Sequence, residues 1–403
     1  MAQKVVQGVA VVVTNRMANF GGVLMRLFCL STISLIAVTT TAAILPEDRA
    51  DVMYHSYDGG GVTIDGPSVL VRKSFAETVS VSANYYVDNV SSASIDVLAS
   101  GASQYEEERT EYSITADYLN NKTLLSGGYT NSSENDYNAS TFYFNISQDM
   151  FGDLTTVSFG YSRGADEVMQ NGNEAFFDET DRQNFRVGVS QILTPSLMVG
   201  FNYEAVTEEG YLNNPYRFYR FQSDPLDIDA GFQTATEVYP RTRTSDAANL
   251  SASYYLPWRA AVKASYRYYT DDWEIDADTF ELGYTHTFGD NWILDLHVRQ
   301  YSQSNAFFYS DLFGFASLDD SDFRARDKEL SEFSTSTFGI GVTYSIPYLR
   351  GKIIDSSTIN LQWDRISFSY DNFRDITAGG PIGEEPLYSF DADVIRLYFS
   401  IWY

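Results

Sequence analysis

The stretch VIRLYFSIWY, residues 394–403, alternates apolar and other side chains over ten residues. One phase of this alternation holds Ile395, Leu397, Phe399, Ile401 and Tyr403. Successive side chains of a β-strand point to opposite faces, so a period of two predicts a strand with one apolar face. About ten residues is also the length that a tilted strand needs to cross a bilayer.

The same alternation recurs along the chain. Apolar and aromatic residues alternate with Ser, Thr, Gly, Asn or charged residues at 79–87, 142–146, 157–161, 197–205, 262–268, 292–298 and 338–346. A soluble β-sandwich would show the same period, so alternation alone leaves the class of β-protein open.

The lengths of the connections favour a membrane barrel. Short turns join strands in pairs, and longer polar segments separate the pairs at 89–107, 164–181, 210–246, 303–332 and 371–389. Tight periplasmic turns and long extracellular loops are typical of outer-membrane barrels. We therefore expect an all-β, transmembrane, antiparallel up-and-down β-barrel of about sixteen strands, with fourteen as the alternative count. Residues 51–57 supply its first strand.

The terminal strand has a further expected role. It would pair with the first strand and close the barrel, which leaves its aromatic end at the periplasmic rim. The residues Leu397, Phe399, Ile401 and Tyr403 resemble the C-terminal signal that the barrel assembly machinery recognises in outer-membrane proteins.

The N-terminal region predicts export. Residues 25–43 contain one basic residue, an apolar run and a small-residue end, which together are typical of a cleaved signal peptide. Residues 1–24 are then an upstream extension or a longer basic region. We expect 1–43 to be removed and 44–403 to form a single outer-membrane barrel domain. The only cysteine, Cys29, would leave with the signal, which excludes disulfides and Cys-ligated metals from the mature chain.

The charge is strongly acidic, with a formal net charge of −27. Three basic residues are the only charges before Glu47, so the remainder carries 24 basic and 54 acidic residues, a net of −30. Such a surface excludes nucleic acid as a partner, because binding it requires cations that neutralise phosphates. Acidic outer segments at 106–109, 166–181, 223–231 and 318–323 either bind divalent cations that bridge to lipopolysaccharide or are simply solvated.

Four blocks of sequence carry a family resemblance. They are LPEDRADVMYHSYDGGGVTIDGPSVLVRK (45–73), GYLNNPYR (210–217), VYPRTRTS (238–245), and YSDLF with RARDKELS (309–331). These blocks resemble a proteobacterial outer-membrane family known as domain of unknown function 3570. The resemblance implies an outer-membrane β-barrel and suggests a periplasmic redox or maturation context. The family has no assigned activity, so the resemblance supplies no catalytic residues.

Charged residues recur on the phase expected to face the lumen. The cations are Arg186, Lys263, Arg267, Arg299 and Arg396, and the carboxylates are Glu111, Asp117, Glu204, Glu281 and Asp295. His297 shares the phase of Asp295 and Arg299, and it either joins a hydrogen-bond network or assists an ion path. These counts predict a lumen with many ion pairs and, at most, a mild cation preference at the mouth.

The longest loop contains two arginines among aromatic residues, in NNPYRFYRFQSDP at 213–225. Arg217 and Arg220 would lie on opposite faces of a strand because they are three residues apart. One interpretation is a loop folded into the lumen that narrows the pore or binds a phosphate. The other is an outer loop that packs on itself.

The sequence favours a passive channel over an enzyme. His55 could join Met53 in a soft-metal site, but a lumen hydrogen bond explains it better. No motif places a serine nucleophile beside a base, so we expect no enzyme, cofactor or metal centre. The first hypothesis is a porin-like solute conduit in the bacterial outer membrane. The alternative is a non-conducting barrel that serves as scaffold or export partner for a periplasmic redox or maturation protein.

Overall fold

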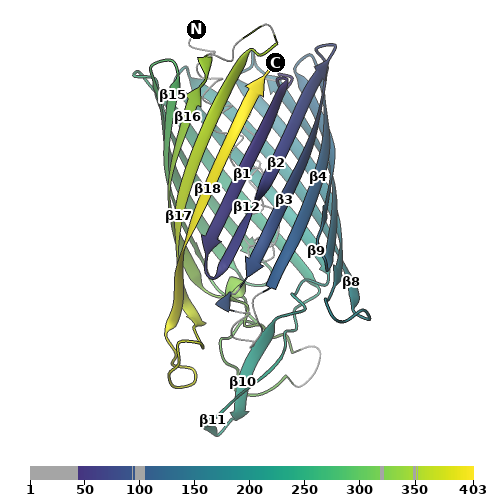
Figure 1. Ribbon diagram of the computed structural model, residues 1–403, viewed down its shortest axis with the longest axis vertical. Helices are drawn as coiled ribbons and strands as arrows, with labels where there is room; N and C mark the ends of the chain where they lie inside the picture. The colour runs from purple at the N-terminus through teal and green to yellow at the C-terminus, as the bar shows by residue number, and fades with distance from the viewer. Residues whose placement is uncertain (1–43, 93, 96–104, 318–321, 348–350, 352) are drawn as a thin grey trace.

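The computed structural model describes residues 44–92, 94–95, 105–317, 322–347, 351 and 353–403. Within them, sixteen antiparallel strands form a closed barrel, and β10 and β11 form a separate hairpin (Figure 1). The strands are β1 Arg49–Gly59, β2 Val62–Phe75, β3 Val79–Ser92, β4 Tyr105–Asn120, β5 Thr123–Ser133, β6 Tyr137–Met150, β7 Thr155–Met169, β8 Phe177–Thr194, β9 Leu197–Gly210, β10 Phe218–Asp224, β11 Asp227–Thr236, β12 Thr242–Leu256, β13 Ala260–Asp271, β14 Asp276–Phe288, β15 Trp292–Gln303, β16 Phe333–Ser345, β17 Ser356–Arg374 and β18 Leu387–Trp402. The expected count of sixteen is confirmed, and the alternative of fourteen is wrong. The expected signal peptide and extension, residues 1–43, lie outside the described residues.

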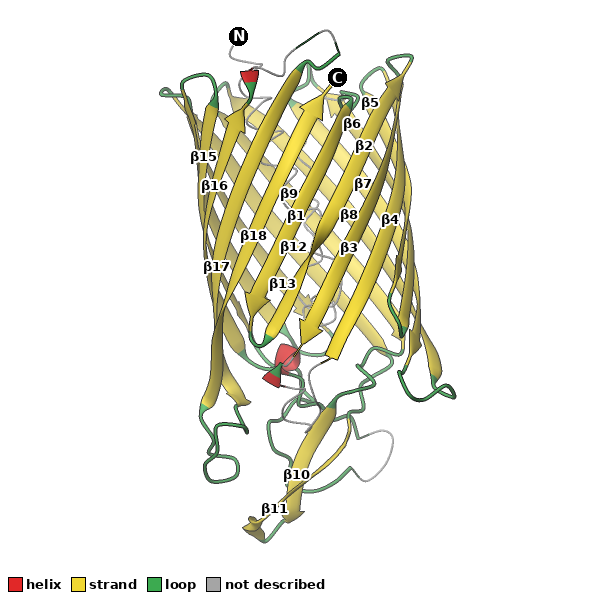
Figure 2. Ribbon diagram, in the orientation of Figure 1, coloured by secondary structure: helices red, strands yellow, loops and turns green. Residues whose placement is uncertain are grey.

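The last strand closes the barrel on the first, as the sequence predicts. The pairing runs from Arg49 opposite Trp402 to Gly59 opposite Ala392. The start of β1 and the end of β18 therefore share one rim, which we call the terminal end. The opposite rim is the loop end, and the β10–β11 hairpin stands beyond it (Figure 2).

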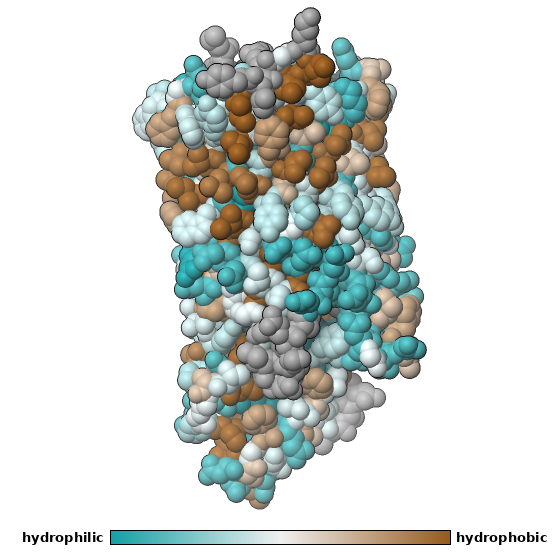
Figure 3. Space-filling view, in the orientation of Figure 1, coloured by the Kyte–Doolittle hydropathy of each residue, from teal (hydrophilic) through white to brown (hydrophobic). Residues whose placement is uncertain are grey.

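Side chains alternate between the lumen and the outer face. On β3, Ser80, Ser82 and Asn84 are buried inside the barrel, whereas Val81 and Tyr85 are exposed outside. A brown apolar band covers the wall toward the terminal end, and the wall becomes hydrophilic toward the loop end (Figure 3). An apolar outer band around a polar interior is the arrangement of transmembrane β-barrels. Within the described residues, no helix is long and apolar enough to span a bilayer.

The turns follow the predicted chemistry. Gly60 and Gly61 connect β1 to β2 with φ of 59° and 76°, and positive φ at both central residues is what a type I′ hairpin turn requires. Six connections at the terminal end are turns of two to four residues, and the seventh, residues 346–355, is only partly described.

The loop end corrects the expected loop lengths. Much of 164–181 and 371–389 belongs to β7, β8, β17 and β18, and residues 134–136 and 272–275 make short turns there. Strand pairing continues beyond the apolar band because backbone hydrogen bonds do not require lipid on the outer face. Polar sequence therefore overestimates where the loops begin.

Candidate functional site: a loop plug in the mouth of the barrel

The connection between β15 and β16 enters the barrel mouth at the loop end. We call its described residues, 304–317 and 322–332, the plug. Ala306, Phe308, Ala325 and Leu330 of the plug are almost fully buried. They pack in one apolar cluster with inward-facing wall residues: Tyr57, Val62, Ile64, Val90, Ala247, Tyr269, Ala277, Tyr301, Phe333, Phe368, Tyr370, Phe373, Ala392 and Val394. The mouth is thus closed by a packed core rather than by a loose loop.

The wall residues of this core come from ten neighbouring strands, β3, β2, β1 and β18 back to β12. Among the described residues, β4 to β9 contribute none. Burial of side chains such as Phe308 and Leu330 stabilises the plug by about 1.5–3 kcal/mol each. The plug therefore binds one side of the mouth and leaves the other side polar.

Aromatic edges join the plug to two neighbouring loops. The ring of Phe308 lies 5.1 Å from Trp273 and 5.3 Å from Tyr239, measured between centroids. Trp273 belongs to the short turn between β13 and β14, and Tyr239 precedes β12. Such tilted and edge-to-face pairs favour one geometry over a sliding contact.

A first ion-pair group ties the plug to the base of the β10–β11 hairpin. Arg217 lies 2.8 Å from Asp327 and 3.2 Å from Glu329, and all three side chains are buried. The backbones of Val238 and Arg324 exchange two hydrogen bonds beside it. Asp327 also caps η1 Lys328–Leu330, a single turn of 3-10 helix, by accepting from the Glu329 amide.

Glu237 is buried in the same group. Its carboxylate accepts hydrogen bonds from the Tyr239 hydroxyl and the Arg326 amide. Burial, helped by the nearby negative charge of Asp327, raises the pKa of Glu237 to about 8, although Arg217 opposes the rise. The closed plug therefore favours the protonated form of Glu237.

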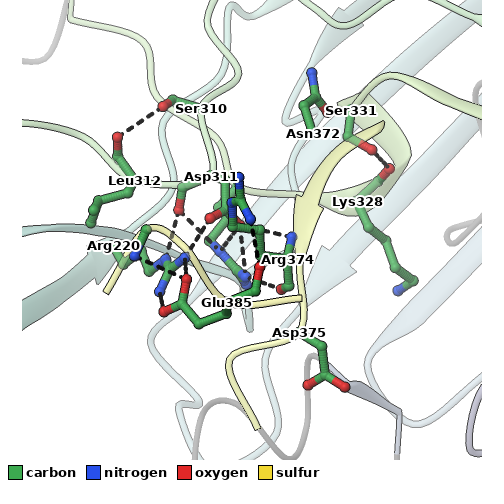
Figure 4. A network of polar contacts seen from close by, with 12 residues as sticks. Arg220, Ser310, Asp311, Leu312, Lys328, Ser331, Asn372, Arg374, Asp375 and Glu385 are labelled. Carbon is green, nitrogen blue, oxygen red and sulfur yellow. Dashed lines mark hydrogen bonds and ion pairs between the residues drawn. The ribbon is translucent and has the colours of Figure 1, made fainter. Parts of the chain in front are cut away.

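A second ion-pair group, the Arg220 clamp, joins three segments of the chain (Figure 4). Arg220, 1% exposed, donates to both oxygens of Glu385, at 2.6 and 3.0 Å, and to the carboxylate and carbonyl oxygens of Asp311. Asp311 belongs to the plug, and Glu385 lies between β17 and β18. Arg326 binds Asp311 from within the plug and donates to the carbonyl oxygen of Arg374 at 2.7 Å.

The structure corrects both interpretations of the long loop. The β10–β11 hairpin extends outward, so residues 213–238 do not fold into the lumen, and the loop does not pack only on itself either. Arg217 and Arg220 bind different carboxylates, as their opposite phases suggested, and both arginines hold the plug. The segment that enters the mouth is the plug, residues 304–317 and 322–332, because its apolar residues match the apolar inner wall.

The other predicted charges lie on the lumen wall. Arg186 and Arg267 meet on Glu204, at 2.7 and 3.3 Å. Lys263 and Arg299 lie on the two strands that flank Glu281 of β14. Separate contacts hold Asp295, which accepts from Thr285 at 2.6 Å, and His297, whose Nε2 lies 3.3 Å from Asp364.

Other wall contacts involve residues that the sequence left unassigned or placed differently. His55 lies 2.7 Å from Asp88 and stacks on Tyr86, so it takes part in a hydrogen-bond network, as expected. Arg109 joins Asp88 to Glu111. The expected lumen of ion pairs thus holds for most wall charges.

Sequence analysis did not identify the acidic residues of the two ion-pair groups that hold the plug. Asp311, Glu385, Glu237, Asp327 and Glu329 come from three loops, and alternation gives no information about loops. A signal was nevertheless present, because each of the four family blocks contributes side chains to the plug or its wall.

Comparison with known families agrees with that signal. The sequence matches the family described as "Protein of unknown function (DUF3570)" over residues 97–352. The chain belongs to this family. The match contains the plug, the β10–β11 hairpin and strands β4 to β16. No curated protein matches the sequence.

Solved structures similar to this DUF3570 protein are barrels at low sequence identity. A bacterial polysaccharide outer membrane secretin aligns with TM-score 0.48 and 7% identity, over 89% of this chain and all of that one. A Pseudomonas aeruginosa FadL homologue aligns with TM-score 0.42 and 10% identity, over 89% and 91%. The ferric enterobactin receptor of Pseudomonas aeruginosa, in a mutant form, gives 0.41 and 10%, and this chain covers 54% of its length.

Proposed function

We propose that the protein is a passive outer-membrane channel whose extracellular mouth is closed by the plug. In this orientation the terminal end faces the periplasm and the apolar band faces lipid. The observation that carries the proposal is the packing of the plug, residues 304–317 and 322–332, against the inner wall of a sixteen-strand barrel. A barrel of this size is wide enough to enclose an aqueous lumen.

The lumen below the plug supports a channel. Its wall carries ion pairs and hydrogen bonds rather than an apolar core. The inward side chains of β5, and those of β9 apart from Val206, stay partly exposed, whereas those of β3 are buried. A polar, partly solvated side therefore runs beneath the part of the mouth that the apolar core does not cover.

The attachment of the plug supports a gate. Its core is apolar on one side, and two compact ion-pair groups hold its edges to other loops. Such a unit has few independent attachments, so release of the clamp would free it as one element. The alternative, a non-conducting scaffold for a periplasmic partner, also fits a closed mouth and predicts no conductance in any variant.

The test is single-channel conductance of the full-length expressed protein, purified from membranes and placed in a planar bilayer. Gln303 and Phe333 are paired neighbours, so a short glycine-containing turn can replace residues 304–332 and rejoin β15 to β16. We expect rare openings from the native protein and long-lived, larger steps from this plug-deleted variant.

The matched control shortens the hairpin tip. Gln222 and Phe232 are paired, so a turn in place of 223–231 shortens an outer segment away from the plug and keeps Arg217 and Arg220. This variant should conduct like the native protein. Silence of the plug-deleted variant would contradict the channel and favour the scaffold, and equal conductance of native and plug-deleted proteins would contradict the gate.

A further inference from the structure

We infer that the inner wall formed by β8, β9 and β13 to β15 is a binding site for small oxyanions that bear phosphate or carboxylate. This inference rests on the proposed channel function and specifies its solute class. It opposes the cation preference that the acidic net charge would suggest.

The site combines four cations with the three carboxylates Glu204, Glu281 and Asp295. Arg186 of β8 and Arg267 of β13 both approach Glu204 of β9. On the intervening strand β12, the inward residues at this level are Ala247, paired with Glu204, and Asn249, paired with Arg267. Across β13 and β14, Glu281 is directly paired with Arg299 in the β14–β15 register. Lys263 lies one inward position further toward the terminal end.

The charges at this site do not balance. Four cations face three carboxylates, which leaves a local net charge of about +1 in a protein of net −27. Elsewhere on the wall, each cation described so far lies against a carboxylate, as in Arg72 with Asp117 and Arg396 with Asp364. The surplus is thus a local feature of this wall.

Two of the four cations are available. Among the described residues, Lys263 and Arg299 make no hydrogen bond or ion pair, and both side chains are partly exposed to the lumen. The charge of Glu281 acts on both from beyond contact distance. An ammonium and a guanidinium with free donors are the groups that recognise phosphate and carboxylate oxygens in proteins.

The site lies directly beneath the plug. The guanidinium of Arg267 is 5.6 Å from the ring of Tyr269, and that of Arg299 is 5.8 Å from the ring of Tyr301. Both tyrosines belong to the wall of the plug core. An anion held here would therefore lie at the inner side of the closed mouth, where a solute that has crossed the gate would first meet the lumen.

At the β15 edge of the site, the His297 and Asp364 side chains pack closely against the backbone of β16. A side chain at Gly339 of β16 would collide with the His297 ring and the Asp364 carboxylate. Glycine at this position lets His297 reach Asp364 across β16. Asp364 is therefore engaged by His297 and Arg396 and does not neutralise Arg299 or Lys263.

The experiment uses the plug-deleted variant in a potassium chloride gradient, with inorganic phosphate as the added probe. We expect a reversal potential that shows chloride preference and a saturable reduction of current by phosphate. The double variant Lys263→Gln, Arg299→Gln should lose the preference and weaken the phosphate effect by about tenfold or more, because each cation supplies charge-assisted hydrogen bonds. Lys263→Arg should retain both properties.

Controls separate this inference from the channel proposal. Arg365→Gln removes a cation from the outer face, where it pairs with Asp391 and Asp393, and should change neither property. Titration calorimetry of the full-length protein with phosphate tests the site even if nothing conducts. Cation preference in the plug-deleted barrel, or unchanged phosphate binding in the double variant, would overturn the inference.

Discussion

Replacing Arg220 with alanine should release the plug and open the channel. Arg220 is nearly inaccessible to solvent, and its guanidinium binds the carboxylates of both Glu385 and Asp311. Arg374 also links the two residues, through its amide to the Asp311 carboxylate and its guanidinium to the Glu385 carbonyl oxygen. After truncation, Asp311 keeps its ion pair with Arg326 at 2.9 Å. The Glu385 carboxylate keeps backbone amide donors, including that of Gly383, but no cation that contacts it. The main cost therefore falls on one buried carboxylate that has lost its cation.

The magnitude follows from that stranded charge. Removing one partner of a buried ion pair costs about 3–5 kcal/mol, because the remaining charge stays desolvated. Glu385 regains water when the plug leaves, so most of this cost applies to the closed state. A change of about 3 kcal/mol multiplies the open-to-closed ratio by roughly a hundred. A channel open for about 0.1% of the time would then be open for about a tenth of it.

The assay is open probability in a planar bilayer, with the native protein measured in parallel. Adding Glu385→Gln to Arg220→Ala removes the stranded charge and should return the open probability part of the way to the native value. Arg365→Ala, which breaks ion pairs on the outer face, serves as control and should leave gating unchanged. An Arg220→Ala open probability within about twofold of native, in a correctly folded barrel, would refute the clamp.

Three further predictions concern the same region and the wall beneath it. Burial holds the pKa of Glu237 near 8, against 4.5 for an ordinary glutamate, so the closed plug should be most stable below about pH 4.5 and lose that contribution as pH rises to about 8. Open probability should increase over this range, and Glu237→Gln should flatten the dependence of open probability on pH. Leu330→Ala should leave a cavity in the plug core that destabilises the closed state by about 2–5 kcal/mol, which should raise open probability at least tenfold. Leu226→Ala at the exposed hairpin tip should not raise it. Gly339→Ala should displace His297 from the Asp364 carboxylate and change the current-voltage curve of the plug-deleted barrel. Infrared spectra should show that the strands stay paired.

The fold could be predicted from the sequence because its cause is local and repeated. Along β3 or β18, every second residue must suit lipid and every other residue must suit the lumen, so the period of two reports the wall directly. The alternation in residues 394–403 and the turn at Gly60 and Gly61 are each set by a few neighbouring residues. Sixteen such alternating segments, each a weak signal alone, together predict a closed barrel.

The plug could not be predicted in the same way, because its cause is not local. Phe308 and Leu330 stand in a polar segment that resembles a solvated loop, and their partners Tyr57 and Phe368 belong to strands at opposite ends of the sequence. Tyr57 continues the inward phase of its strand but is apolar, which breaks the rule that inward residues are polar. Exceptions of this kind gather at the loop end of β1, β2 and β12 to β18, and they are the signal that a plug leaves in the wall.

That signal also explains why the clamp and the lumen site lie next to each other. Inward positions change from charged to aromatic at the level where the plug begins, as Arg267 gives way to Tyr269 and Arg299 to Tyr301. In each pair the tyrosine lies one inward position nearer the loop end than the arginine whose guanidinium it contacts. The same level of the wall therefore forms the inner boundary of the plug and the outer boundary of the anion site. A variant that moves Tyr301 should alter both closure of the mouth by the plug and solute binding in the lumen.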